Sequence, residues 1–210
     1  MGALSSIEEL LFGLKQAFDA TTDHRLLEAS RAGDEAAFAE LVQRYRHPIT
    51  NYIYRLTNDY DLAVDLAQET FLRVYGALAR YHTNFAFSTY IYRIATNLAI
   101  SELRRRKRRR FISLTAFFQP NGDSGDGADF DLTDDRPLPD AKLVASERQR
   151  AIARAIASLP EKYRVPLILR DIEERNYEEI AQILHLSEGT VKSRISRARA
   201  LLREKLRNYL

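Results

Sequence analysis

A segment rich in Gly, Asp and Pro, residues 119–140, separates two stretches of helical periodicity in this 210-residue chain. The segment offers few apolar side chains for burial, so it is typical of a flexible linker. Neither flanking stretch alternates apolar and polar residues with a period of two over a useful length. The sequence therefore predicts an all-α chain, in which two small helical domains are joined by a flexible acidic linker.

The charges are distributed unevenly, although the formal net charge is only +3. Residues 104–110 are seven consecutive cations, whereas residues 111–140 hold seven Asp and one Arg, a balance of −6. The remaining residues therefore carry +9, and such a basic surface favours polyanionic partners. The predicted organisation is an N-terminal extension (1–23), a first helical domain (24–110), the acidic linker (111–140) and a second helical domain (141–210).

The first domain shows clear helix start and stop signals. Gly33-Asp34-Glu35 is expected to begin a helix with its acids in the first turn, and Pro48 is expected to kink or restart it. Asn58-Asp59 is expected to form a turn before a second amphipathic helix, and Ser88 is expected to cap a third. Ala37, Phe38, Leu41, Val42 and Tyr45 form the apolar side of the first of these helices.

The second domain contains a helix–turn–helix pattern. Pro160 is expected in the first turn of a helix, and Asn176 with Glu179 forms a capping-box pattern. Ser187 is placed to cap a last helix with one buried stripe, made by Val191, Ile195, Ala198 and Leu202. The other sides of that helix are basic, as expected of a helix that enters the major groove. A helical hairpin whose cations only contact water is the alternative.

Several classes of protein are excluded or disfavoured. The chain has no Cys and four scattered His, so neither a disulfide framework nor a thiolate metal site can form, and no metal or cofactor is expected. No apolar run approaches the ~18 residues that span a membrane, which predicts a cytoplasmic protein without membrane insertion. No nucleophile–base pair or Gly-rich phosphate loop is present, so the chain is not expected to be an enzyme.

Aromatic residues accompany the cations of the first domain. Tyr90 and Tyr92 lie upstream of the 104–110 run, and aromatic side chains beside cations stack on unpaired bases. Tyr81, Phe85 and Phe87 lie in or beside an expected loop, where they either contact bases or fill the core. Single-stranded nucleic acid is therefore a candidate ligand of this domain.

Six motifs, in this order and spacing, resemble those of the extracytoplasmic-function (ECF) sigma factors of the sigma-seventy family. Region 2 of that family resembles Gly33-Asp34-Glu35-Ala36-Ala37-Phe38, Asp65-Leu66-Ala67-Gln68-Glu69-Thr70-Phe71 and Tyr90-Ile91-Tyr92-Arg93-Ile94-Ala95-Thr96-Asn97. Region 4 resembles Leu159-Pro160-Glu161-Lys162-Tyr163-Arg164, Tyr177-Glu178-Glu179-Ile180-Ala181 and Gly189-Thr190-Val191-Lys192-Ser193-Arg194. The resemblance covers about residues 24–207 apart from the linker.

The resemblance implies a sigma factor that binds bacterial core RNA polymerase, recognises promoter −35 and −10 elements and supports promoter melting and transcription initiation. It assigns core polymerase binding to Asp61, Asp65, Leu66, Gln68, Glu69 and Phe71. It assigns binding of the −10 element to Tyr81, His82, Asn84, Phe85, Ser88, Tyr90, Arg93, Asn97, Arg104 and Arg105. It assigns binding of the −35 element to Thr190, Lys192, Ser193, Arg194, Ser196 and Arg197.

The individual side chains suit these roles. Asn97 offers a donor and an acceptor to an exposed base edge, and Arg197 offers two parallel hydrogen bonds to guanine. Tyr90 lies where the family usually has Trp, and a Tyr at this position retains an aromatic face. Ser196 is small where some relatives have a larger residue, so the −35 sequence that this chain reads is expected to differ from theirs.

The resemblance also bears on the linker and the partners. The linker is expected to run through the polymerase, where its Asp residues either mimic nucleic acid or serve only as a tether. An anti-sigma factor is a further expected partner. Residues 1–23 lie outside the resemblance, and Ile7, Leu10, Leu11, Leu14 and Phe18 predict a short amphipathic helix there. The alternatives are an operator-binding helix–turn–helix regulator and a sigma mimic that sequesters a partner.

Overall fold

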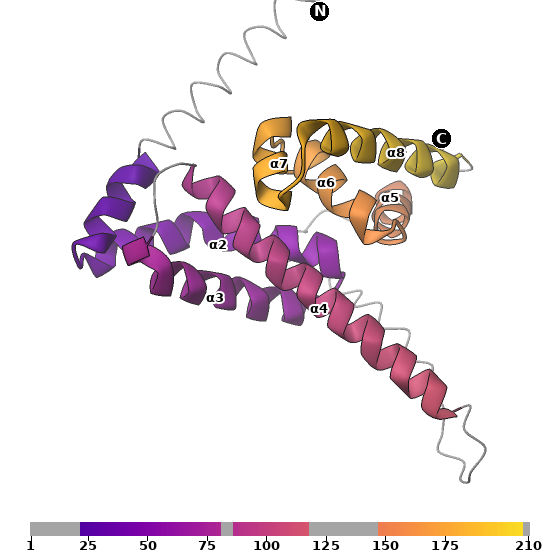
Figure 1. Cartoon of the computed structure of the whole chain (residues 1–210), viewed down its shortest axis with the longest axis horizontal. Helices are drawn as coiled ribbons and strands as arrows, with labels where there is room; N and C mark the ends of the chain where they lie inside the picture. Colours follow the sequence, from indigo (N-terminus) through magenta and orange to yellow (C-terminus); the bar gives the residue numbers. More distant parts are fainter. Residues whose placement is uncertain (1–21, 81–85, 118–146, 208–210) are drawn as a thin grey trace, which may run out of the picture.

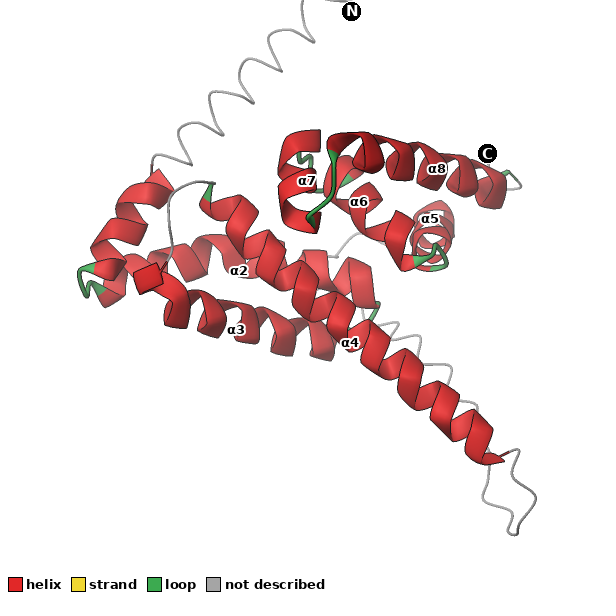
Figure 2. Cartoon of the chain, viewed as in Figure 1, coloured by secondary structure: helices red, strands yellow, loops and turns green. Residues whose placement is uncertain are grey.

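The computed structural model describes residues 22–80, 86–117 and 147–207, with side chains at 22–80, 86–109 and 151–207. Within these ranges every regular element is a helix (Figure 2), which confirms the predicted all-α class. None of the described helices is both long and apolar enough to cross a bilayer. The N-terminal residues 1–21 and residues 118–146, which include most of the predicted linker, lie outside the described parts.

The first unit contains a helix at 22–31 and three longer helices that pack side by side (Figure 1). Its elements are α2 (Glu35–Thr57), α3 (Tyr60–Ala77), a 3₁₀ turn η1 (Leu78–Arg80) and α4 (Phe87–Phe117). The far half of α4 projects beyond the bundle. Because α4 continues to Phe117, residues 111–117 of the predicted linker are helical.

Local signals set the ends of α2 and α3. Asp34 caps α2, since its carboxylate accepts hydrogen bonds from the backbone N–H groups of Ala36 and Ala37 at 2.9 and 3.1 Å. Asn58 ends the helix in the left-handed conformation with φ 53°, and Asp59 caps α3 by accepting from Leu62 N at 2.9 Å. The expected helix start at Gly33–Glu35 and the turn at Asn58–Asp59 are both confirmed.

Two expected helix ends in this unit are wrong, the restart at Pro48 and the cap at Ser88, whereas the alternative of a kink at Pro48 stays a prediction. Pro48 does not restart the helix, because α2 runs through it, and the buried Tyr45, Ile49 and Tyr52 around it fix the helix against the core. Ser88 is not the cap of α4, which begins one residue earlier, at Phe87. Phe87 is only 3% exposed, so it fills the core and is unavailable to a base.

In the described residues the second unit has three short helices and a longer last one. They are α5 (Glu147–Ala157), α6 (Glu161–Asp171), α7 (Tyr177–Leu184) and α8 (Glu188–Leu206). Pro160 is the cap of α6 rather than its first residue, a shift of one position from the prediction. The capping box is confirmed: Glu179 N donates to Asn176 Oδ1 at 2.8 Å and Asn176 N donates to Glu179 Oε2 at 2.9 Å. Ser187 caps α8, as predicted.

Polar contacts inside the first unit fix α2 against its neighbours. Tyr52 and Thr96 are fully buried, and their hydroxyl oxygens lie 2.7 Å apart between α2 and α4. Asp23, on the helix at 22–31, is buried and accepts hydrogen bonds from Tyr45 and, at 2.6 Å, from Arg44. Burial and the Asp23 carboxylate both raise the pKa of Tyr45 above its usual range. The Asp23 contact holds the helix at 22–31 on the surface of α2.

The two units share a hydrophobic core, which the sequence did not predict. Ile168 of α6, Ile180 and Ile183 of α7 and Ile195 of α8 belong to the same buried cluster as the core of the first unit. Leu159, Leu167 and Ala198 form a smaller cluster within the second unit. The units therefore pack against one another rather than standing apart.

Candidate nucleic-acid interface

An exposed stripe runs along α3. Asp61, Asp65 and Gln68 are exposed and follow one another at spacings of four and three, so they share one side of the helix. Leu72 and Tyr75 continue this side, and they are 68% and 53% exposed. We call these five residues the α3 stripe. Exposed large apolar side chains on a regular stripe are typical of a protein-binding surface.

A groove with a volume of about 770 Å³ lies between α2 and α3, beside the α3 stripe. Its apolar lining includes Phe38, Val42 and Phe71, and Gln68, Leu72 and Tyr75 belong to both the groove and the stripe. Phe38 of α2 packs edge-on against Tyr75 of α3, with ring centroids 4.9 Å apart. The dimensions and the apolar lining suit the side chains of an amphipathic helix from a partner.

The other residues expected to bind polymerase are placed differently. Phe71 is only 8% exposed and forms part of the groove wall, whereas the half-buried Leu66 packs against the core. Glu69 flanks the stripe and pairs with Arg73 at 2.7 Å. The sequence-based prediction did not include Leu72 and Tyr75. Continuing the helical spacing of Asp61, Asp65 and Gln68 by four residues would have identified Leu72.

A second polar stripe lies on α4. Tyr90, Arg93, Asn97 and Arg104 follow at spacings of three, four and seven, so they share one side of the helix. We call these four residues the α4 stripe. Asn97 is exposed, Tyr90 and Arg93 are half-buried, and burial raises the pKa of the Tyr90 hydroxyl above its ordinary value of 10.0. The stripe thus combines an amide, an aromatic ring and two guanidinium groups.

The structure does not bring all the expected −10 residues onto the α4 stripe. Ser88 lies on the opposite side of the helix, where its hydroxyl accepts a hydrogen bond from Arg175 of the second unit at 3.1 Å. Tyr92 is 2% exposed, so its ring cannot stack on a base in this structure. Tyr81, His82, Asn84 and Phe85 lie outside the described residues, so they stay predictions.

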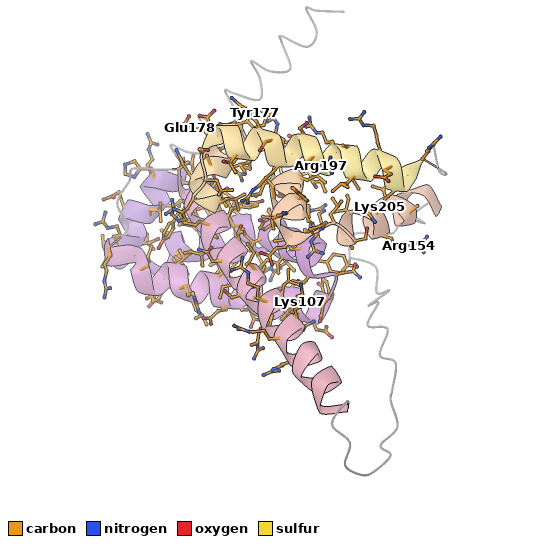
Figure 3. All side chains as sticks on the ribbon, turned by 45° about the vertical axis from the view of Figure 1, so that its right-hand side comes forward. Lys107, Arg154, Tyr177, Glu178, Arg197 and Lys205 are labelled. Carbon is orange, nitrogen blue, oxygen red and sulfur yellow. The ribbon has the colours of Figure 1, made fainter. Side chains whose placement is uncertain are left out.

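The cationic run extends along the projecting part of α4, where Figure 3 labels Lys107. Arg105 donates to Glu102 at 2.6 and 2.9 Å, and Arg106 donates to Glu102 and to Asp59 at 3.3 and 2.8 Å. The hydrogen bonds from Arg105 lower the pKa of Glu102, which therefore stays ionised. Lys107 and its exposed neighbours Arg108 and Arg109 point charge at solvent, which suits a nucleic-acid backbone.

The third surface is the exposed side of α8, labelled at Arg197 in Figure 3. Lys192, Ser193, Ser196 and Arg197 are exposed and adjacent on this side, with spacings of three and four. Lys192 lies 3.4 Å from Glu188 and 5.4 Å from the ring centroid of Tyr177, which turns it toward the start of the helix. We call these four residues the α8 face.

Thr190 and Arg194 flank the α8 face and are half-buried. The Thr190 backbone N–H donates to Ser187 at 3.3 Å, and Ser193 donates to the carbonyl of Thr190 at 2.9 Å, so the first turn is held by its own side chains. Val191, Ile195 and Ala198 are buried as predicted, whereas Leu202 is half-buried. Burial of that stripe orients the α8 face toward solvent.

None of the described side chains form a cluster of three or more groups that could hold a metal ion. The three surfaces consist of side chains that bind through charge, hydrogen bonds, aromatic rings and apolar contact.

Comparison with known proteins finds two family matches. The models of "Sigma-70 region 2" and "Sigma-70, region 4" match residues 41–109 and 149–202, respectively. The chain is 36% identical over 178 residues to the ECF RNA polymerase sigma factor SigW of Bacillus subtilis. That alignment covers 85% of this chain and 93% of SigW. The α3 and α4 stripes lie in the first matched range, and the α8 face lies in the second.

Two solved structures have a similar fold. One is CnrH in complex with the cytosolic domain of CnrY, with a TM-score of 0.64, 21% sequence identity and coverage of 89% of this chain and 98% of that one. The other is the sigma factor RpoE from Bartonella quintana in complex with the anti-sigma factor NepR. Its TM-score is 0.59 at 22% identity, covering 81% of this chain and 96% of that one.

Proposed function

Because the chain belongs to the ECF sigma factors of the sigma-70 family, we propose that it directs core RNA polymerase to promoters and supports their melting. The observation that carries this proposal is the presence of three exposed surfaces of different chemistry on one chain. The α3 stripe suits a protein partner, the α4 stripe suits unpaired bases and the α8 face suits duplex DNA. An operator-binding regulator would need only the last of these.

The α3 stripe and its groove are the proposed site for core polymerase. Asp61 and Asp65 present negative charge, while Leu72 and Tyr75 present apolar area beside the groove. Such a combination binds a basic amphipathic helix through charge steering and apolar burial. Since Asp61 and Asp65 are exposed, they contribute more to association rate and specificity than to affinity, whereas Leu72 contributes affinity.

The α4 stripe is the proposed site for the −10 element. Melting requires a base to leave the stack, which costs a few kcal/mol of free energy. Stacking of that base on an aromatic side chain is favourable by about 1–3 kcal/mol and offsets part of this cost. Tyr90 supplies an aromatic face and Asn97 supplies both hydrogen-bonding groups for a base edge. The cations from Lys107 to Arg109 would hold the backbone without reading sequence.

The α8 face is the proposed reader of the −35 element. A bidentate Arg–guanine pair discriminates against a wrong base by about 1–3 kcal/mol, and Arg197 is the residue placed for it. Lys192 lies at the start of the helix and acts on phosphates. The role requires no catalysis by this chain, because the polymerase performs the chemistry, and it places the chain beside the polymerase in the bacterial cytoplasm.

An anti-sigma factor is a second proposed partner of the groove between α2 and α3. The fold is shared with RpoE from Bartonella quintana, which was solved with the anti-sigma factor NepR. An inhibitor that occupied the groove between α2 and α3 would compete with core polymerase for Leu72 and Tyr75. Competition between the two partners for one apolar groove needs no conformational change in the chain.

The deciding experiment is reconstitution with bacterial core RNA polymerase. The purified chain is expected to bind core enzyme in a 1:1 complex and to start transcription from a subset of a promoter library. Leu72→Asp should weaken core binding by at least about tenfold, since it places a charge in a desolvated contact. Ile152→Asp is the matched control, because Ile152 is also an exposed apolar residue but lies on α5.

Promoter reading is tested on the same complex. Arg197→Ala should reduce discrimination at one −35 base pair by about 5–150-fold, which corresponds to about 1–3 kcal/mol. Arg203→Ala is the control, because Arg203 is exposed on the same helix but beyond the α8 face. Failure of the wild-type chain to bind core polymerase, together with sequence-specific binding to duplex DNA alone, would favour the operator-binding regulator.

A further inference from the structure

Two acidic side chains lie where the projecting part of α4 begins. Glu102 is on α4, and it accepts hydrogen bonds from Arg105 at 2.6 and 2.9 Å and from Arg106 at 3.3 Å. Asp59, at the start of α3, accepts another hydrogen bond from Arg106 at 2.8 Å. Lys107, the next residue, already lies on the projecting part (Figure 3). We call Glu102 and Asp59 the acidic pair.

The acidic pair divides the cations at residues 105–109 into held and free side chains. Arg105 is held by Glu102, and Arg106 is held by both acids. Within the described part of the chain, the three cations at 107–109 form no ion pair, and all three are exposed. The resemblance to the family assigned Arg105 to −10 DNA, but in the structure its charge is balanced inside the protein.

A balanced cation contributes little to DNA binding. Affinity for the DNA backbone comes from the release of counterions when a cation neutralises a phosphate, and a guanidinium that is already paired with a carboxylate supplies no net charge for this exchange. A phosphate could capture Arg105 only by breaking two charge-assisted hydrogen bonds to Glu102. The carboxylate left behind would then repel the phosphate beside it. The cations at 107–109 face neither cost.

Stability of the fold does not require the charge of the acidic pair. The side chains of Arg105 and Arg106 are 53% and 39% exposed, and ion pairs with such exposed cations contribute little because water screens them. Asp59 caps α3 through its other oxygen, since Oδ1 accepts from Leu62 N at 2.9 Å and leaves Oδ2 for Arg106. Asn serves as well as Asp at such a cap, so the cap needs no charge. The charges therefore act mainly on the two guanidinium groups.

We propose that the acidic pair is a specificity determinant, which withholds Arg105 and Arg106 from DNA and so limits binding to DNA of any sequence. This inference rests on the proposed function, because it assumes that α4 binds the −10 element. In a promoter complex, base contacts of Tyr90 and Asn97 fix the position of α4, so only cations that already face a phosphate contribute. Without base contacts the strand is free to shift, and every free cation finds a phosphate. Loss of the acidic pair therefore favours DNA of the wrong sequence.

The salt dependence of DNA binding by the free, full-length chain counts the cations that reach DNA. The probe is a fluorescent single-stranded oligonucleotide without a promoter sequence, and anisotropy reports its binding at a series of salt concentrations. Each phosphate contact contributes about 0.7 to the slope of log K against log salt. Lys107→Ala should therefore reduce the slope by about 0.7, whereas Arg105→Ala, which removes the same charge, should leave it unchanged.

Removal of the acidic charge should have the opposite effect. Glu102→Gln releases Arg105 and should steepen the slope by about 0.7, so that its affinity relative to the wild type rises about fivefold for each tenfold fall in salt. Asp59→Asn alone should change little, because Arg106 retains Glu102 and the cap is kept. In the Glu102→Gln background, Asp59→Asn should steepen the slope by a further 0.7 or about that amount, because Arg106 then loses both partners.

Glu28→Gln is the matched control for the acidic variants. Glu28 accepts from Arg31 at 3.1 Å, three residues further along the helix at 22–31. The variant changes the net charge by the same amount and releases one guanidinium, but far from the projecting part of α4 (Figure 1). Its slope should stay closer to that of the wild type than the slope of Glu102→Gln. Urea unfolding establishes that the acidic variants are folded.

Specificity is measured on the complex with core RNA polymerase. The quantity is the ratio of affinities for a promoter fragment selected from the library and for the same fragment with a scrambled −10 element. Glu102→Gln should lower this ratio by up to about fivefold, mainly by raising the affinity for the scrambled fragment. Glu28→Gln should leave the ratio unchanged.

The outcomes separate this inference from the proposed function. An equal fall in slope with Arg105→Ala and Lys107→Ala would overturn the inference, whatever the chain does with polymerase. A slope for Glu102→Gln no steeper than that for Glu28→Gln, or an unchanged ratio of affinities, would also overturn it. Absence of polymerase binding by the wild-type chain would overturn the proposed function and the role in specificity, while the salt slopes would still report whether Arg105 is withheld.

Discussion

The buried hydroxyl pair between α2 and α4 makes a quantitative prediction. Thr96 is fully buried and donates to the carbonyl of Tyr92 at 2.6 Å. Because its single hydrogen is used there, the hydroxyl of Tyr52, 2.7 Å away, is the donor to Thr96. Thr96→Val keeps the shape and removes the acceptor, which leaves the Tyr52 hydroxyl buried without a partner.

The expected cost follows from this geometry. An unsatisfied buried hydroxyl costs about 1–3 kcal/mol, so Thr96→Val should lower the free energy of unfolding by about 2 kcal/mol. For a chain of this size that is a fall of about 4–8 °C in Tm. Tyr52→Phe should cost only about 1 kcal/mol, since Thr96 retains its bond to the Tyr92 carbonyl. The double variant should cost clearly less than the sum, because neither polar group is then left alone.

Urea unfolding followed by circular dichroism measures all three variants. Thr70→Val is the matched control, because Thr70 is also fully buried and donates to a carbonyl one turn back, at 2.7 Å, within its own helix. Its cost should stay below that of Thr96→Val. The reasoning is refuted if the two substitutions at Tyr52 and Thr96 add within about 0.5 kcal/mol, as independent sites do.

Three further predictions follow from groups elsewhere in the structure. Burial raises the pKa of Tyr52 and Tyr92 above the ordinary 10.0, so the folded chain keeps protons that the unfolded chain loses. Stability should therefore hold up to about pH 10 and fall above it, and the tyrosinate absorbance of these two residues should appear only on unfolding. Asn176→Ala removes one half of the capping box and should lower the free energy of unfolding by about 1 kcal/mol in urea titrations, whereas Asn176→Asp should not. Replacing Lys107 and Arg108 with Ala should reduce the slope of log K against log salt by about 1.4 for single-stranded DNA, and an unchanged slope would remove these cations from the backbone contact.

The helices and their ends were largely predictable from the sequence, because they depend on neighbours a few residues apart. Asp34, Asn58 and Ser187 act on backbone groups within four positions, and the structure places them as expected. Pro48 shows the limit of local reasoning. Its ring removes one hydrogen bond, but the buried side chains on both sides of it hold α2 continuous, and that burial depends on α4.

The chemistry of the binding surfaces was also present in the sequence, since charge, amides and aromatic rings do not depend on packing. The sides on which they lie were less predictable. Ser88 and Tyr92 each lie two residues from Tyr90 in the sequence but face the second unit, because the 3.6-residue period of the helix turns them inward. Leu72 lies on the extension of the Asp61–Gln68 spacing, but the structure was needed to show that Leu72 and Tyr75 stay exposed beside the groove between α2 and α3.

The sequence by itself determined an all-helical chain with two helical regions, a basic last helix and an acidic connection between the regions. Only the tertiary structure decided that the two regions pack together, with Glu173 and Arg175 against Tyr92. The physical reason is the separation along the chain over which each interaction acts. Capping and periodicity act within one turn or two, whereas this contact joins residues about eighty positions apart, and its favourable energy exists only once both units have folded.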